Sequence, residues 1–216
     1  MHTLNKSAYG LAICLSALAG CVDAIGFLQL SGHFISFMSG NSTQLAVGLM
    51  LGNGSGVILL GGIVACFVIG AMFGALVRHF STASSAIVTV LAFVTFLLAA
   101  AAACYEMGWG FFTIAFMTLA MGAENAVFQR DGDVVVGLTY MTGTLVKVGQ
   151  RLARALVGGP KFTWVPYLLL WMGLIFGGAM GALLFFFFGL RSLWVAVAWS
   201  AGLALVARVL KHKLMV

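Results

Sequence analysis

A five-residue motif occurs twice in this chain, 103 positions apart, and each copy interrupts an apolar stretch. Residues 37–41 read Phe-Met-Ser-Gly-Asn, and residues 140–144 read Tyr-Met-Thr-Gly-Thr. The similarity extends outward, since 20–25 matches 122–127, and 70–76 matches 178–183 with one residue dropped. Two related halves, each with a broken hydrophobic segment at an equivalent place, are typical of secondary transporters.

The composition restricts the chain to a membrane protein. The sequence is 62% hydrophobic and 7% charged, with a mean hydropathy of +1.13. Several apolar stretches reach the roughly 20 residues that a helix needs to cross a bilayer. No polar region is long enough to form a separate soluble domain. We therefore predict one all-α membrane domain, a polytopic helical bundle, made of two halves, residues 1–105 and 106–216.

Six apolar segments are predicted to cross the bilayer, and two more contain the motif copies. The six are 7–30, 57–77, 84–104, 109–129, 163–189 and 192–210. The first is too long for a cleaved signal peptide and contains Asp23, so we expect it to remain as the first span. The motif-bearing segments, 31–52 and 133–158, either dip into the membrane and return, which gives six spans, or cross it, which gives eight.

The basic residues favour six spans. With six spans and the N-terminus inside, Arg191 alone faces outward, and the other ten lie toward the cytoplasm: Lys6, Arg78, Arg130, Lys147, Arg151, Arg154, Lys161, Arg208, Lys211 and Lys213. With eight spans, Arg78 and Arg130 would also face outward. Because cytoplasmic loops carry the excess of Lys and Arg, we predict six spans with both termini cytoplasmic. The halves would then be inverted, with the tips of the broken segments converging near the middle of the membrane.

Two carboxyl groups are candidates for coupling transport to protons. Asp23 lies about two-thirds along the first span among apolar neighbours. A carboxylate there costs about 2.5–3.5 kcal/mol on insertion scales and should face a partner or water. Its alternative role is a structural hydrogen bond or salt bridge. The repeat places Asn125 at the matching position, with Glu124 beside it as a second proton-coupling candidate or as a partner of Lys or Arg.

The motif copies supply groups that could bind a solute. The predicted substrate-binding residues are Ser39, Gly40, Asn41, Thr43, Gln44, Asn125, Thr142, Gly143 and Thr144. Their hydroxyls, amides and exposed backbone suit an uncharged polar solute, or an anion where a helix N-terminus points into the cavity. The alternative is that they only satisfy the backbone groups freed by the break.

A cationic stripe follows the second motif copy. Lys147, Arg151 and Arg154 recur at helical spacing, opposite a row of apolar residues, and therefore predict an amphipathic helix. The first half has no charge at the equivalent positions. The stripe would act as an anion gate at the cytoplasmic mouth or as an anchor to anionic lipid headgroups.

Other function classes lack their usual motifs. The sequence contains no paired His–Glu metal signature, no GxSxG and no phosphate-binding loop, so we expect no enzyme activity, no cofactor and no metal site. The net charge of +6 does not indicate nucleic-acid binding, because the basic residues sit at segment ends. The expected partners are the lipid bilayer, a small-molecule or ion substrate, and a second copy in a homo-oligomer.

The first half resembles a known family. A Gly-x-x-Asp-Ala sequence at 20–24, followed by Met-Ser-Gly-Asn at 38–41, is similar to the signature of the bacterial YoaK-type small permeases, a domain-of-unknown-function family. The resemblance is most specific over residues 17–52, with Ser39 in place of threonine. It implies a permease of the bacterial inner membrane and carries over the motif residues Asp23, Ser39, Gly40 and Asn41.

These features together predict a secondary transporter of a small polar or anionic solute, with Asp23 as the proton-coupling group. A passive channel lined by the same breaks is one alternative. A non-transporting membrane subunit, which scaffolds or dimerises through small-residue helix faces, is the other.

Overall fold

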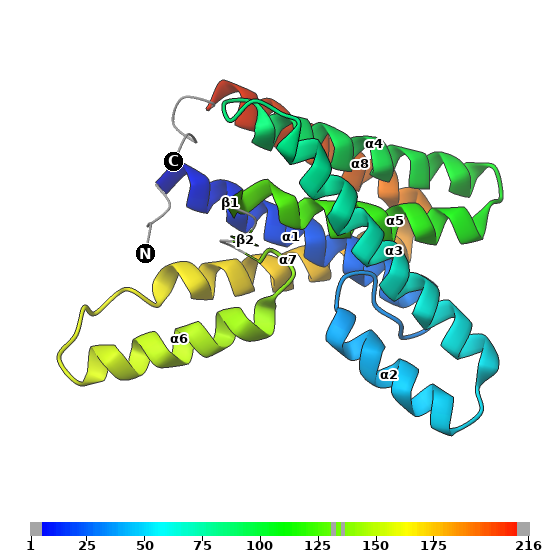
Figure 1. Cartoon of the computed structure of the whole chain (residues 1–216), viewed down its shortest axis with the longest axis horizontal. Coiled ribbons are helices and arrows are strands. Elements are labelled where there is room, and N and C mark those ends of the chain that lie inside the picture. The colour runs from blue at the N-terminus through cyan, green and yellow to red at the C-terminus, as the bar shows by residue number, and fades with distance from the viewer. Residues whose placement is uncertain (1–5, 131–132, 135–136, 211–216) are drawn as a thin grey trace.

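The computed structural model describes residues 6–130, 133–134 and 137–210, which form a helical bundle (Figure 1). The helices are α1 Lys6–Gln29, α2 Met38–Met50, α3 Gly54–His79, α4 Ala86–Glu106, α5 Gly110–Glu124, α6 Met141–Leu156, α7 Val165–Phe188 and α8 Leu193–Val209. Two short 3-10 helices, η1 Asn125–Phe128 and η2 Gly189–Ser192, follow α5 and α7. Lys211, Lys213 and the side chains of Lys6 and Arg130 lie outside the described part. The predicted all-α helical bundle is confirmed.

Six helices in the described part belong to stretches that can cross a membrane. Five such stretches are long and apolar enough, and the last of them, Val165–Val209, contains both α7 and α8. Gly189 separates these two helices, with a positive φ of 56° that a residue with a side chain rarely adopts. The two remaining helices, α2 with 13 residues and α6 with 16, lie outside these five stretches.

The two short helices are re-entrant in their course. We call the end of the bundle where α1 begins and α8 ends the terminal end, and the other the opposite end. In Figure 1, α2 begins near the middle of the bundle and runs out toward the opposite end, where α1 also ends. Helix α6 begins near the middle and runs out toward the terminal end, the direction in which α5 also runs. Each short helix thus leaves on the side from which its segment entered, as in the six-span arrangement.

Side chains hold the backbone of the first break. The chain turns sharply after α1 at Ser31 and Gly32, whose φ angles are 52° and 109°. The Asn41 side chain then accepts from the Phe34 N–H at 3.0 Å and donates to the Phe34 carbonyl at 2.6 Å. Gln44 donates to the Gly32 carbonyl at 3.1 Å. These side chains therefore satisfy several of the backbone polar groups freed by the break, as a membrane interior requires.

The second break differs from the predicted one in detail. The helix predicted over 109–129 ends at Glu124 and continues as η1. A two-residue antiparallel ribbon follows, in which β1 Gln129–Arg130 pairs with β2 Asp133–Val134. The ribbon was not predicted, because two-residue strands leave no periodic pattern in a sequence. Arg78 on α3 holds this region by donating from Nη1 to the Val127 carbonyl at 2.9 Å.

Glycines bring the spanning helices together in two pairs. Helix α1 packs closely against α7, and α3 packs closely against α5. A methyl group at Gly177 or Gly181 would collide with the backbone of α1, at Ala17 and Cys21 respectively. The same holds for α3, where Gly70 and Gly74 meet the α5 backbone at Leu119 and Ala123. These are the small-residue faces that let membrane helices approach closely.

The basic residues are divided between the two ends. Arg78, Lys161 and Arg208 lie at the terminal end, and α6 carries Lys147, Arg151 and Arg154 toward it. Arg191 lies at the opposite end, where its Nε is 3.3 Å from Glu106 Oε1. Among the described basic residues, this is the division that the six-span arrangement predicts.

Candidate functional site

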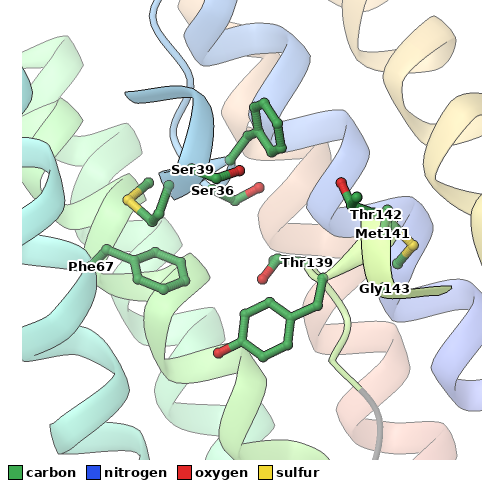
Figure 2. Close-up of a pocket in the computed structure, with 10 residues that line it drawn as sticks. Ser36, Ser39, Phe67, Thr139, Met141, Thr142 and Gly143 are labelled. Carbon is green, nitrogen blue, oxygen red and sulfur yellow. The ribbon is translucent and has the colours of Figure 1, made fainter. Parts of the chain in front are cut away.

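A pocket of about 270 Å³ lies between the two motif copies. Figure 2 shows Ser36 and Ser39 of the first break facing Thr139 and Thr142 of the second, with Phe67 of α3 at one side. The full lining is Ser36, Phe37, Met38, Ser39, Phe67, Thr139, Tyr140, Met141, Thr142 and Gly143. These residues include four hydroxyl side chains of Ser and Thr, one phenol and no ionised side chain. The pocket therefore suits a small solute that is bound by hydrogen bonds.

The N-termini of α2 and α6 both reach this pocket. The residues preceding the two helices, Phe37 and Tyr140, make no side-chain hydrogen bond that caps them. The first N–H groups of a helix have no acceptor within the helix, and they carry its positive partial charge. Since both helices contribute first-turn residues to one pocket, their N–H groups and dipoles favour an anion or an electronegative solute atom there.

The two breaks are tied to the preceding helical segments through equivalent positions. Asp23 Oδ1 accepts from the backbone N–H groups of Ile35 and Ser36, both at 2.7 Å. In the second half, Asn125 Oδ1 accepts from the Thr139 hydroxyl at 3.2 Å. Asp23 and Asn125 are the positions equated by the sequence repeat. Each holds a hydroxyl residue, Ser36 or Thr139, that also lines the pocket.

Three of the predicted substrate-binding residues line the pocket, namely Ser39, Thr142 and Gly143. The others are in contact with nearby parts of the chain. Asn41 and Gln44 form hydrogen bonds with the backbone of Phe34 and Gly32 in the first break. Asn125 accepts a hydrogen bond from Thr139, and Gly40 lies against the Phe37 ring. Thr43 and Thr144 donate to the carbonyls four residues earlier in their helices, Ser39 and Tyr140.

Sequence reasoning missed most of the pocket lining. Ser36 and Thr139 precede the motif copies by one residue, and both carry a hydroxyl group. Extending the repeat by one position would have found them. Phe67 has no such signal, because it enters the site only through the packing of α3.

Glu124 is completely buried at the end of α5, with 0% of its surface exposed. Neither carboxyl oxygen has a hydrogen-bond partner within the described part of the chain. Its neighbours in the sequence lie next to the pocket, since Asn125 bonds Thr139. An unpaired polar group in an apolar core is costly, which marks Glu124 as a group that needs explanation.

The predicted cationic stripe lies on α6. The ammonium Nζ of Lys147 lies 5.7 Å from the centroid of the Tyr167 ring on α7. Arg151 is half-buried, and Arg154 is exposed in the last turn of α6. The stripe therefore begins with an exposed cation beside the Tyr167 ring of α7 and ends at the terminal end of the bundle.

Replacing Asp23 by alanine is expected to lower the free energy of unfolding by roughly 2–4 kcal/mol, because two buried backbone N–H groups lose their acceptor. Asn at this position keeps an oxygen in place, as Asn125 does in the second half, so Asp23→Asn should cost half of that or less. Thermal unfolding in detergent, followed by tryptophan fluorescence, measures both variants. Equal stability of the alanine variant and the wild type would contradict this structural role.

Comparisons with known proteins identify a family. The family model described as a protein of unknown function (DUF1275) matches residues 11–206. The chain is 37% identical over 193 residues to the UPF0700 transmembrane protein RA0705 of Rhizobium meliloti (strain 1021), covering 88% of this chain and 83% of the relative. No solved structure matches. The expected resemblance to a domain-of-unknown-function membrane family is confirmed. With its spanning helices, the chain is a multi-pass membrane protein, and it belongs to the DUF1275 family.

Proposed function

We propose that the chain is a secondary transporter that binds a small polar or anionic solute between the N-termini of α2 and α6. One observation carries the proposal. Two re-entrant helices begin at the same pocket, and first-turn residues of both, Ser39 from α2 and Thr142 and Gly143 from α6, line it. Broken helices whose positive ends meet near the middle of the membrane are the usual binding sites of transporters.

Helix packing supports an inverted repeat of two halves. The contacts pair Gly70 with Leu119 and Gly177 with Ala17. If residues 1–105 correspond to residues 106–216, these two contacts are equivalent, because Ala17 corresponds to Leu119. The α3–α5 and α1–α7 pairs then become the same interface used twice. In this alignment, residues 67–76 correspond to residues 174–183. It needs no dropped residue, unlike the alignment made from the sequence alone.

An inverted repeat gives the pocket a route to either side of the membrane. The pocket lies between the halves, with α2 leading toward the opposite end and α6 toward the terminal end. Rocking one half against the other would open it toward one end at a time, as in alternating access. From the excess of basic residues at the terminal end, we infer that this end, where α1 begins and α8 ends, faces the cytoplasm of a bacterial cell.

Glu124 is our candidate for the proton-coupling group. Its carboxyl group is buried and has no partner among the described residues, whereas the Asp23 carboxylate is held by two backbone N–H groups. Ionisable groups inside membranes mark proton and ion pathways. The Asn125–Thr139 hydrogen bond connects the residue next to Glu124 to the pocket. A change in the charge of Glu124 can therefore affect the α6 N-terminus through the hydrogen bond between Asn125 and Thr139.

Uptake into proteoliposomes tests the function and the coupling. The probes are radiolabelled formate, acetate, phosphate, sulfate, glycine and glycerol, each measured with and without an inward proton gradient. At least one solute should accumulate above empty liposomes, and the gradient should increase its uptake. In Glu124→Gln, which keeps the shape but not the acid, gradient-driven uptake should fall at least about tenfold while solute exchange persists.

Other outcomes distinguish the alternatives. Uptake that follows the solute gradient and ignores the proton gradient would indicate a passive channel. A purified, folded protein that moves no solute and copurifies with a partner would indicate a scaffold. Gradient-driven uptake that is unchanged in Glu124→Gln would remove the coupling role of this residue.

A further inference from the structure

Two cations and two tyrosines lie together on the terminal-end side of the pocket. We call Tyr9, Lys147, Arg151 and Tyr167 the cation–tyrosine cluster. Lys147 Nζ lies 5.7 Å from the Tyr167 ring centroid. Tyr9 is close enough to Tyr167 and Arg151 to interact electrostatically with both. The four residues come from α1, α6 and α7. Lys147 is exposed beside the Tyr167 ring, and Arg151 is half-buried.

The cluster lies one or two helical turns from the pocket, in the direction of the terminal end. At the pocket, Ser16 of α1 lies 4.0 Å from the Met141 sulfur and donates to the Leu170 carbonyl of α7 at 2.9 Å. Tyr9 precedes Ser16 by seven residues, and Tyr167 precedes Leu170 by three. At 1.5 Å per residue, the two tyrosines lie about 10 Å and about 5 Å further toward the terminal end.

The pocket-lining face of α6 continues into the cations. Gly143 lines the pocket, and Lys147, Arg151 and Arg154 follow it at intervals of four, four and three residues. Residues at these intervals share one face of a helix. Helix α2 has no charged residue, so the path along it lacks this feature. The charge along the two re-entrant helices is therefore strongly asymmetric.

We propose that the cation–tyrosine cluster is an anion-binding vestibule, through which a small anion passes between the pocket and the terminal end. The inference rests on the transporter function proposed above and narrows its substrate class from polar solutes to anions. The ammonium, guanidinium and two phenol groups would bind the anion along the path. The uncapped N-termini of α2 and α6 would receive it in the pocket. A path lined by one sign of charge concentrates ions of the other sign and speeds their entry.

The same cations could instead hold the phosphate of an anionic lipid, and both sources share one chemistry. The structure favours a solute, because Lys147 lies over the Tyr167 ring of α7, Arg151 is half-buried, and both continue the pocket-lining face of α6. An experiment can separate the two sources by changing the lipid while keeping the protein constant.

Access of charged thiol reagents to the pocket tests the vestibule without knowledge of the substrate. Thr142→Cys is placed in a protein whose four native cysteines are replaced, in nanodiscs of phosphatidylcholine. Reaction rates are measured with sulfonatoethyl methanethiosulfonate, which is anionic, and trimethylammonioethyl methanethiosulfonate, which is cationic, and are divided by their rates with free mercaptoethanol. The anionic reagent should be favoured by about tenfold or more.

Neutralising the cluster should remove this preference. Lys147→Gln with Arg151→Gln is expected to lower the anion-to-cation ratio at least about fivefold. Lys147→Arg should keep it. Arg208→Gln, which removes an exposed cation from α8 at the same end, is the matched control and should also keep the ratio. Tryptophan fluorescence and size exclusion check that each variant is folded.

The remaining outcomes contradict the inference in distinguishable ways. An unchanged ratio in the double variant overturns the vestibule and leaves the pocket standing. A preference that vanishes when phosphatidylglycerol is added to the nanodiscs assigns the cations to lipid headgroups and also overturns it. No reaction of the Thr142→Cys thiol with either reagent shows that water does not reach the pocket, which contradicts the proposed transporter function itself.

Discussion

Replacing Gly143 by leucine is expected to abolish solute uptake while the protein remains folded. Gly143 lines the pocket in the first turn of α6, and a Cβ atom built there meets nothing within 4 Å. A leucine side chain therefore starts in open space and fills part of a cavity of only about 270 Å³. Leucine also favours the helix over glycine by up to about 1 kcal/mol, so the fold should not suffer. Uptake in proteoliposomes should fall to the level of empty vesicles.

The same helix provides the control for this prediction. Gly149 is exposed on α6, away from the pocket lining, and a Cβ there also meets nothing within 4 Å. Gly149→Leu makes the same chemical change and should leave uptake unchanged. Full uptake by Gly143→Leu, in protein that elutes and unfolds like the wild type, would show that the solute does not use this pocket.

Gly177→Ala is expected to destabilise the protein by about 1–3 kcal/mol, because the added methyl group cannot be accommodated. Its Cβ would collide with the carbonyl and Cα of Ala17 in the α1 backbone. Backbone atoms in a packed helix pair can yield only if the helices separate. The loss should exceed the gain of up to about 1 kcal/mol in helix propensity that alanine brings over glycine.

The next residue in α7 tests whether the effect comes from this contact. A Cβ at Gly178 would lie 3.7 Å from the Gly20 carbonyl oxygen, which is an ordinary contact distance. Gly178→Ala should therefore be neutral or slightly stabilising in thermal unfolding. If both variants unfold at the same temperature, the close α1–α7 approach does not exist in the membrane protein.

The spanning helices were predictable because each one is a continuous apolar stretch of about the length that crosses a bilayer. The apolar segments 163–189 and 192–210 correspond to α7 and α8. The ends were less predictable. The chain leaves α5 through a 3-10 turn and a ribbon that depend on contacts such as that between Arg78 and Val127.

The pocket was only partly predictable for a related reason. The motif copies drew attention to hydroxyl and amide residues, but the sequence alone does not reveal which way each side chain points. Ser39 and Thr142 face the cavity. Asn41, with 0% exposure, instead bonds both backbone groups of Phe34. Some residues of the motif therefore line a possible solute site, and others satisfy backbone groups that the break leaves free.

The most direct test of the central claim is whether water-soluble reagents reach the pocket from both sides of the membrane. Ser39→Cys, in a background without native cysteines, is reconstituted in oriented vesicles and exposed to an impermeant maleimide added outside or enclosed inside. Asn53→Cys and Thr82→Cys, at opposite ends of the bundle, report the orientation, and Val206→Cys on the exposed face of α8 serves as a lipid-facing control. A transporter with its binding site between α2 and α6 predicts labelling of the Ser39→Cys thiol from each side and none of the Val206→Cys thiol. Labelling from one side alone, or from neither, would contradict the account.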